Sequence, residues 1–276
     1  METKGKTIKK EMKLLKALIN SFRFPQFFFF LSVLTMGFFS VKNGPSYLSI
    51  SKLILCAVSI FFLWWGNSLI NDFYDLQIDK ITNRLRPLVR GLANPEDFKK
   101  YGFLFLFVSL IPTFFVGLHI FLISVFCVIL SILYSPLKWG KSPFASLFIA
   151  LGSSLVFIQG SLIFGVTKKS LIFSLFLFLS LSLVVTSKDL KDYEAEKGKV
   201  LNVFTFFGRE KGKVVNFFFN FFGSLIWALL VKELFWILLF VSLSISLFFF
   251  ITEKLKIIMF LYLAEISFIF YFYFFL

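Results

Sequence analysis

Apolar residues recur along the chain in runs of about 18 residues or more, separated by shorter polar segments. A helix of that length crosses about 30 Å of hydrocarbon. The runs therefore predict nine membrane-spanning helices, with the two longest polar segments after the second and the sixth. The predicted spans are residues 14–40, 50–72, 101–117, 119–135, 144–166, 170–187, 213–231, 233–251 and 256–275.

The composition agrees with an all-α, polytopic membrane protein. Hydrophobic residues make up 58% of the 276 positions and charged residues only 16%, which is not the composition of a soluble domain. In lipid, only helices and closed barrels satisfy their own backbone groups, and the alternating pattern of a barrel strand is absent. The chain has one histidine and two cysteines, both within apolar runs, so a zinc or haem site lacks its ligands.

The distribution of positive charge predicts the orientation in the membrane. With the N-terminus inside, 24 of the 29 lysine and arginine residues fall in cytoplasmic segments and five in outer ones, as the positive-inside rule requires. Topology therefore explains the net charge of +14, and we expect no nucleic-acid partner. The basic segment 1–23, with its lysines from Lys4 to Lys16, is expected to lie on anionic membrane lipids. The predicted location is the cytoplasmic membrane.

We expect residues 1–276 to form one membrane domain. Its two long cytoplasmic loops, at 73–100 and 188–212, carry the candidate functional residues. Five of the six aspartates lie in two short stretches, 71–79 and 188–196, in these loops or in the helix ends that lead to them. Aspartates that merely made the loops soluble would not gather in this way. We therefore expect the functional site there, on the cytoplasmic side.

Local electrostatics disfavours the first stretch, residues 71–79 (NDFYDLQID). Asp72, Asp75 and Asp79 lie close together on a helix, where like charges repel by a few tenths of a kcal/mol per pair. They also follow the C-terminal end of a predicted span, where the helix dipole is negative. Asn71 stacks on Asp75 and Asp79 at helical spacing, so several oxygens face one direction. A bound divalent cation is the simplest way to offset the repulsion among these carboxylates.

The second stretch, residues 188–198 (KDLKDYEAEKG), repeats the pattern. On a helix Asp189, Asp192 and Glu196 stack at i, i+3 and i+7. Carboxylate and amide oxygens suit Mg²⁺, which completes its shell with water and substrate phosphates. Because both stretches are interleaved with Arg and Lys, two such Mg²⁺ sites facing one another would bind a diphosphate.

These stretches resemble the signatures of the UbiA superfamily of intramembrane prenyltransferases. Residues 71–79, with Asn83 and the segment 86–91 (RPLVRG), resemble the first signature, and residues 188–196 resemble the second. Residues 134–138 (YSPLK) are similar to a further family element, so the resemblance covers nearly the whole chain. It implies a bundle of nine membrane helices around a central cavity, which the two acidic stretches cap from the cytoplasm.

The resemblance also implies an activity and residue roles. A polyprenyl group would pass from its diphosphate, bound with Mg²⁺, to a small aromatic or lipid-like acceptor. One Mg²⁺ would be held by Asn71 and Asp75, and the other by Asp192 and Glu196. Supporting catalytic roles fall to Asp72, Asp79, Asp189 and Lys188. The expected diphosphate contacts are Arg86, Lys138, Lys188 and Arg84.

Three positions depart from the family pattern. Glu196 stands where the family usually has Asp, Ala195 where Gly is common, and Val184 where an aromatic residue is often found. Because Glu is one methylene longer but still a hard oxygen ligand, we expect an adjusted metal site. Phe-rich helices offer a dry lining, and aromatic faces stabilise a carbocation by about 0.5–2 kcal/mol.

Two other classes of membrane protein are alternatives. An ion-coupled transporter would carry carboxylates near mid-span and paired broken helices, whereas these acids lie at helix ends among basic residues. Another lipid-diphosphate transferase, a CDP-alcohol phosphotransferase, would carry a DG, AR and GxxxDxxxD pattern, which is missing. The acceptor stays open between a quinone precursor such as 4-hydroxybenzoate and geranylgeranylglyceryl phosphate.

Overall fold

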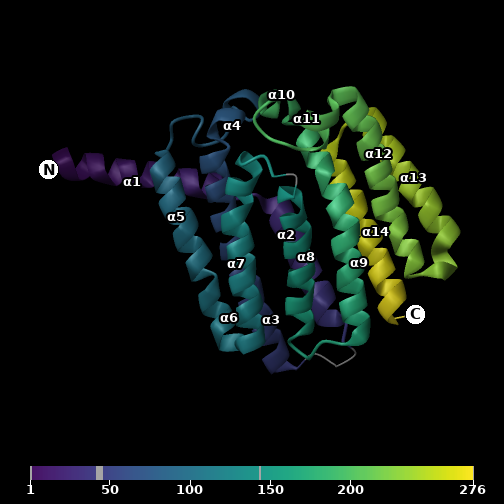
Figure 1. Ribbon diagram of the computed structural model, residues 1–276. Coiled ribbons are helices and arrows are strands. Elements are labelled where there is room, and N and C mark those ends of the chain that lie inside the picture. The colour runs from purple at the N-terminus through teal and green to yellow at the C-terminus, as the bar shows by residue number, and fades with distance from the viewer. Residues whose placement is uncertain (1, 42–45, 143, 276) are drawn as a thin grey trace. The chain divides into compact units, whose positions relative to one another are not determined.

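The computed structural model describes residues 2–41, 46–142 and 144–275, with the backbone alone for residues 2–10, and these segments contain helices and no strand (Figure 1). The α-helices are α1 Glu2–Asn20, α2 Phe24–Phe39, α3 Tyr47–Tyr74, α4 Leu76–Thr82, α5 Pro95–Val108, α6 Leu110–Val116, α7 Leu118–Trp139, α8 Ala145–Ser161, α9 Lys168–Val184, α10 Tyr193–Glu196, α11 Val203–Phe207, α12 Arg209–Leu225, α13 Phe235–Thr252 and α14 Leu255–Phe275. Three short 3₁₀ helices are η1 Val185–Leu190, η2 Ile226–Leu229 and η3 Lys232–Leu234.

The helices confirm the predicted fold class, an integral, multi-pass, all-α membrane protein. Seven helical segments of the described chain are long and apolar enough to cross a membrane. They are α3, α5 with α6, α7, α9 with η1, α12 with η2, η3 with α13, and α14. The remaining two predicted spans correspond to the α1–α2 pair and to α8, an apolar helix of 17 residues.

The first predicted span, residues 14–40, is wrong as a continuous helix. The chain leaves the helix after Asn20, resumes it at Phe24 and bends by 56° between α1 and α2. Pro25 gives the physical reason, because proline has no N–H to donate and its ring crowds the carbonyl four residues earlier. A hydrophobic run alone did not reveal this break.

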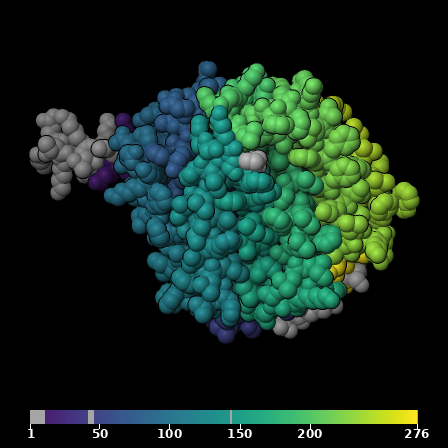
Figure 2. Space-filling view, in the orientation of Figure 1, coloured from purple at the N-terminus to yellow at the C-terminus, as the bar shows by residue number. Residues whose placement is uncertain are grey.

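The outward-facing surfaces of the helices are strongly apolar. On α13, which is yellow-green in Figure 2, Trp236 is 77% exposed, Phe240 is 71% exposed and Ile251 is 75% exposed. On α6, Phe114 and Phe115 are also exposed. Exposed apolar surface on this scale is unfavourable in water, and lipid tails are its natural neighbours.

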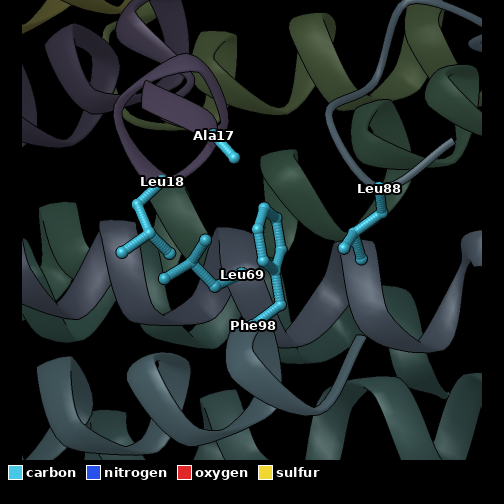
Figure 3. Close-up of a cluster of buried hydrophobic side chains, with 5 residues drawn as sticks. All are labelled: Ala17, Leu18, Leu69, Leu88 and Phe98. Carbon is cyan, nitrogen blue, oxygen red and sulfur yellow. The ribbon is translucent and has the colours of Figure 1, made fainter. Parts of the chain in front are cut away.

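The chain divides into two compact units. One comprises Met1–Phe28 and Ile54–Pro136, and the other Phe29–Leu53 and Leu137–Leu276. In the first unit, side chains of α1, α3, α5 and the loop before α5 share a buried cluster (Figure 3). The cluster consists of Ala17, Leu18, Leu69, Leu88 and Phe98. Since Leu69 lies one turn before Asp72, this core fixes the end of α3 that carries the first acidic stretch.

In the second unit, neighbouring helices pack in sequence. α8 packs on α9, α9 on α12, and α12 on α13, beside which it runs in Figure 1. Phe173 on α9 is the centre of an aromatic cluster, with ring centroids 4.9 Å from Phe157 and 5.0 Å from Trp227. At the α2–α8 crossing the hydroxyls of Ser40 and Ser161 lie 3.0 Å apart. Such close crossings by small residues are typical of membrane helices.

Candidate functional site

The first acidic stretch begins in the last turn of α3 and continues into α4. The amides of Asp75, Asp79 and Asn83 donate to the carbonyls of Asn71, Asp75 and Asp79, respectively, each at 2.8 Å. This i to i+4 register places Asn71, Asp75 and Asp79 along one side, as their spacing predicted. The side chains of these three residues and of Asp72 are all buried. Three buried carboxylates on neighbouring helical turns require compensating positive charge.

Two arginines supply part of that charge. Arg23, from the bend between α1 and α2, donates Nη2–H to Asp72 Oδ1 at 2.5 Å. Arg86 Nη1 lies 3.5 Å from the same oxygen, and its Nε lies 4.0 Å from Asp79 Oδ2. A guanidinium has five N–H donors, so Arg86 can hold these carboxylates and still offer N–H groups to a phosphate.

Burial changes the titration of Asp79 at the end of the stretch. Burial raises the pKa of Asp79 to about 6. Two groups oppose this rise: the Asn83 amide, which donates to Asp79 Oδ1 at 2.7 Å, and the positive charge of Arg86. The charges of Asp72 and Asp75 raise the pKa of Asp79 further. A bound cation would favour the ionised carboxylate and lower this pKa.

The second acidic stretch lies on η1 and α10, in the second unit. The Asp192 amide donates to the Asp189 carbonyl at 3.3 Å, and the Glu196 amide to the Asp192 carbonyl at 2.9 Å. The three acids therefore keep the predicted i, i+3, i+7 spacing. They do so on a 3₁₀ turn followed by a single α-helical turn, rather than on the continuous helix that the sequence suggested.

Glu196 is almost fully buried and has two partners. Lys138 Nζ lies 2.8 Å from its Oε1, and Asn202 Nδ2 donates to its Oε2 at 2.7 Å. Burial raises the pKa of Glu196 to about 6, while Lys138 opposes the rise. Each carboxylate oxygen has a second lone pair, so both can still accept a cation. Nearby, Lys188 Nζ lies 2.9 Å from Asp189 Oδ1.

Each stretch also contains a carboxylate oxygen that is buried and without a hydrogen-bond partner among the described residues. These oxygens are Asp72 Oδ2 and Asp192 Oδ1. An unsatisfied buried carboxylate oxygen is costly, so each is suited to a cation. No three His, Cys, Asp or Glu side chains of the described chain gather into a metal-binding group. The donors present are carboxylate and amide oxygens, and such hard ligands fit Mg²⁺, which takes one or two carboxylates and completes its shell with phosphate and water.

Asn202 joins Glu196 to the start of α11. Its Oδ1 accepts from the amides of Phe204 and Thr205 as the N-cap, while its Nδ2 holds Glu196. We predict that Asn202→Ser, which retains a capping oxygen but loses the donor, weakens Mg²⁺ binding about tenfold. Its melting temperature should stay near that of the wild type.

The measurement is a Mn²⁺ or Mg²⁺ titration in detergent, beside thermal unfolding. Asn202→Ala, which loses the capping oxygen and the donor together, serves as the control. Its free energy of unfolding should also fall, by about 1 kcal/mol. An Asn202→Ser protein with unchanged metal affinity would refute the role of the amide.

Sequence reasoning missed three features of the site. Arg23 belonged to the basic N-terminal segment and gave no signal of its contact with Asp72. Asn202 lies outside both acidic stretches. Just before the second stretch, Ser187 Oγ lies 3.0 Å from both Asn216 Oδ1 and Asn220 Oδ1, so its single proton can be donated to either. Here a signal existed, since two asparagines four residues apart interrupt the apolar face of α12.

The predicted phosphate contact Arg84 is exposed.

Known proteins resemble this chain in sequence and in fold. A model of the UbiA prenyltransferase family matches residues 29–273. Digeranylgeranylglyceryl phosphate synthase of Methanosphaera stadtmanae is 28% identical over 146 residues, 53% of this chain and 54% of that protein. 4-Hydroxybenzoate octaprenyltransferase of Pasteurella multocida is 31% identical over 127 residues, 45% of this chain and 43% of that protein. The matched part thus spans about half the length of these relatives.

The fold has a solved counterpart. The structure of a UbiA homologue from Archaeoglobus fulgidus bound to DMAPP and Mg²⁺ superposes with a TM-score of 0.68 at 20% identity. The match covers 93% of this chain and 98% of that one.

Proposed function

This chain belongs to the UbiA prenyltransferase family, and we propose that it is a Mg²⁺-dependent enzyme that transfers a polyprenyl group from an isoprenoid diphosphate to an acceptor in the membrane. One observation supports the proposal most directly. Two separate acidic stretches each hold a buried carboxylate oxygen without a partner among the described residues, and each is bordered by Arg or Lys. Such a pattern suits a metal-bound diphosphate better than an ion-transport path.

We assign the metal ligands as the sequence suggests. Asn71 and Asp75 would hold one Mg²⁺, and Asp192 and Glu196 the other, with Asp72 close to the first. When bound, Mg²⁺ neutralises the diphosphate and makes it a better leaving group.

The basic side chains have distinct roles in this proposal. Arg86 and Lys188 would contact the diphosphate oxygens while Asp79 and Asp189 orient them through the ion pairs described above. Lys138 is buried against Glu196, so it would fix that ligand as well as offer N–H groups to a phosphate. Arg84, being exposed, would add a more distant positive charge.

Group transfer begins when the bond between the allylic carbon and the diphosphate oxygen breaks. The electron pair leaves with the diphosphate, and the allylic cation reacts with the acceptor, which forms the new bond and loses a proton. Water would compete for this cation, so the site must be dry. The 45 phenylalanines of this chain suit that demand, because an aromatic face attracts a cation by about 0.5–2 kcal/mol.

We further propose geranylgeranylglyceryl phosphate as the acceptor. Several similar proteins, among them those of Methanosphaera stadtmanae and Pyrococcus horikoshii, are digeranylgeranylglyceryl phosphate synthases. A second candidate is 4-hydroxybenzoate, because the octaprenyltransferase of Pasteurella multocida is 31% identical in its matched part. The charge distribution supports an orientation with the N-terminus and both acidic stretches on the cytoplasmic side of one membrane domain.

Purified protein with Mg²⁺ and labelled geranylgeranyl diphosphate tests the proposal when either acceptor is added. We expect a labelled digeranylgeranylglyceryl phosphate, and no product after chelation of the metal. Prenylated 4-hydroxybenzoate alone would favour the second candidate. If neither acceptor gives a product and no diphosphate is released, the proposed function is wrong, and ion uptake into proteoliposomes would test the transporter alternative.

A further inference from the structure

The bend between α1 and α2 is fastened to α3 in the first unit. Trp65 donates its indole N–H to the carbonyl of Leu18 at 2.9 Å, and Trp64 donates to the carbonyl of Arg23 at 3.1 Å. The Leu18 carbonyl lies in the last turn of α1, where it also accepts from the Ser21 amide at 3.2 Å, so Trp65 adds a second donor that ties this helix end to α3. The ring of Phe22 packs on Trp65 with centroids 5.8 Å apart. The bend is therefore held against α3 by specific hydrogen bonds and aromatic packing.

The same bend reaches the first acidic stretch. The Arg23 guanidinium donates to Asp72 Oδ1 at 2.5 Å, and the Asp72 side chain is only 1% exposed. Asp72 Oδ2 and the buried Arg23 Nε have no hydrogen-bond partner among the described residues. Arg23 makes the shorter of the two guanidinium contacts to Asp72 Oδ1, since Arg86 lies 3.5 Å from the same oxygen, and both leave Oδ2 available. Any movement of the bend would move this carboxylate.

The described part of α1 ends at this bend and has three faces. One face packs in the core, a second exposes apolar side chains, and a third carries lysines between them. The core face consists of Leu14, Ala17 and Leu18. The exposed apolar face consists of Met12, Leu15 and Ile19, and the lysines are Lys13 and Lys16.

This surface fits an anionic bilayer. Met12 is 67% exposed, Leu15 is 57% exposed and Ile19 is 50% exposed, and they lie at helical spacing on one side. Lysines beside an apolar stripe lay their stems on it and extend their ammonium groups to lipid phosphates. The sequence adds four more lysines in residues 2–10, against two glutamates over the whole helix. A neutral protein partner would leave these charges unused.

We propose that α1 couples the charge of the membrane surface to the first acidic stretch, with Arg23 as the positioning residue that makes the connection. When α1 lies on anionic lipid, the bend holds Arg23 against Asp72 and the stretch is ordered. When α1 is released, Asp72 loses the Arg23 guanidinium and keeps only the longer, 3.5 Å contact with Arg86, so the stretch loosens. The effect on turnover rests on the proposed prenyl-transfer function, whereas the effect on order does not.

The lipid arm of the test uses proteoliposomes of phosphatidylcholine with and without phosphatidylglycerol. The wild type should turn over faster in the anionic vesicles. Lys13→Gln/Lys16→Gln should weaken attachment of α1 by about thirtyfold and lose the stimulation, while keeping the rate in neutral vesicles. Lys254→Gln/Lys256→Gln carries the same change in net charge away from α1 and should stay stimulated.

The arginine arm separates coupling from a merely structural role. Arg23→Gln should respond equally to both vesicles, whereas Arg23→Lys, which keeps the charge, should recover part of the stimulation. Hydrogen exchange at residues 71–79 should be slower in anionic vesicles for the wild type and insensitive to lipid in Arg23→Gln. Because exchange needs no turnover, a chain that transfers no prenyl group can still show the coupling. Full lipid stimulation of turnover and exchange in Arg23→Gln would overturn the proposal.

Discussion

The Asp192→Asn variant is expected to fold like the wild type and to lose prenyl transfer by about a hundredfold or more. Asp192 Oδ1 is buried and has no hydrogen-bond partner among the described residues, so the amide should not break a hydrogen bond at this oxygen. The amide retains the shape of the side chain and the backbone bonds to Asp189 and Glu196. It removes the negative charge and one hard oxygen, which are the properties that a bound Mg²⁺ needs.

Initial rates with labelled geranylgeranyl diphosphate, measured over a range of Mg²⁺ concentrations, test this expectation beside a melting curve. Glu194→Gln is the matched control, because Glu194 lies two residues further on, is exposed and changes charge in the same way. That control should keep its activity. If Asp192→Asn turned over at more than half the wild-type rate, the second acidic stretch could not be a metal site.

Spacing along one helix carried most of what the sequence revealed about the site. Asn71, Asp75 and Asp79 share a side because residues four apart on a helix must do so, and the backbone hydrogen bonds follow that register. Hydrophobic runs located the spans for a similar reason, since each run is a local property. The sequence erred where one residue changed the local geometry, as Pro25 did within the first predicted span.

Contacts between distant segments could not be predicted in this way. Arg23 and Asp72 are 49 residues apart, and nothing in their surroundings links them. The pairing of Lys138 with Glu196 likewise depends on where α7 ends relative to α10. A helical pattern reveals which residues share a face but not which helix that face meets. The acidic stretches and the nearby cations Arg86, Lys138 and Lys188 were therefore visible in the sequence, while the carboxylate that each cation contacts was not.

The second large effect is expected from Gly160→Ala, which should destabilise the protein by about 1–3 kcal/mol or more. A Cβ added at Gly160 would lie 2.1 Å from the Leu34 carbonyl oxygen and 2.8 Å from the Phe38 amide nitrogen. Across the same crossing, a Cβ on Gly37 would lie 1.9 Å from the Phe157 carbonyl oxygen. These neighbours are backbone atoms of α2 and α8, so the helices must separate to accommodate a methyl group.

Gly152→Ala on the same helix is the matched control, because only Gly160→Ala should lower the melting temperature. Apart from the adjacent backbone of α8 itself, no described atom lies within 4 Å of a Cβ at Gly152, and alanine favours a helix interior over glycine by about 1 kcal/mol. Helix propensity alone would therefore make both variants more stable. We expect thermal unfolding in detergent to show a raised or unchanged melting temperature for Gly152→Ala and a clearly lowered one for Gly160→Ala. Equal melting temperatures would mean that α2 and α8 do not cross as closely as described, because only that crossing distinguishes the two glycines.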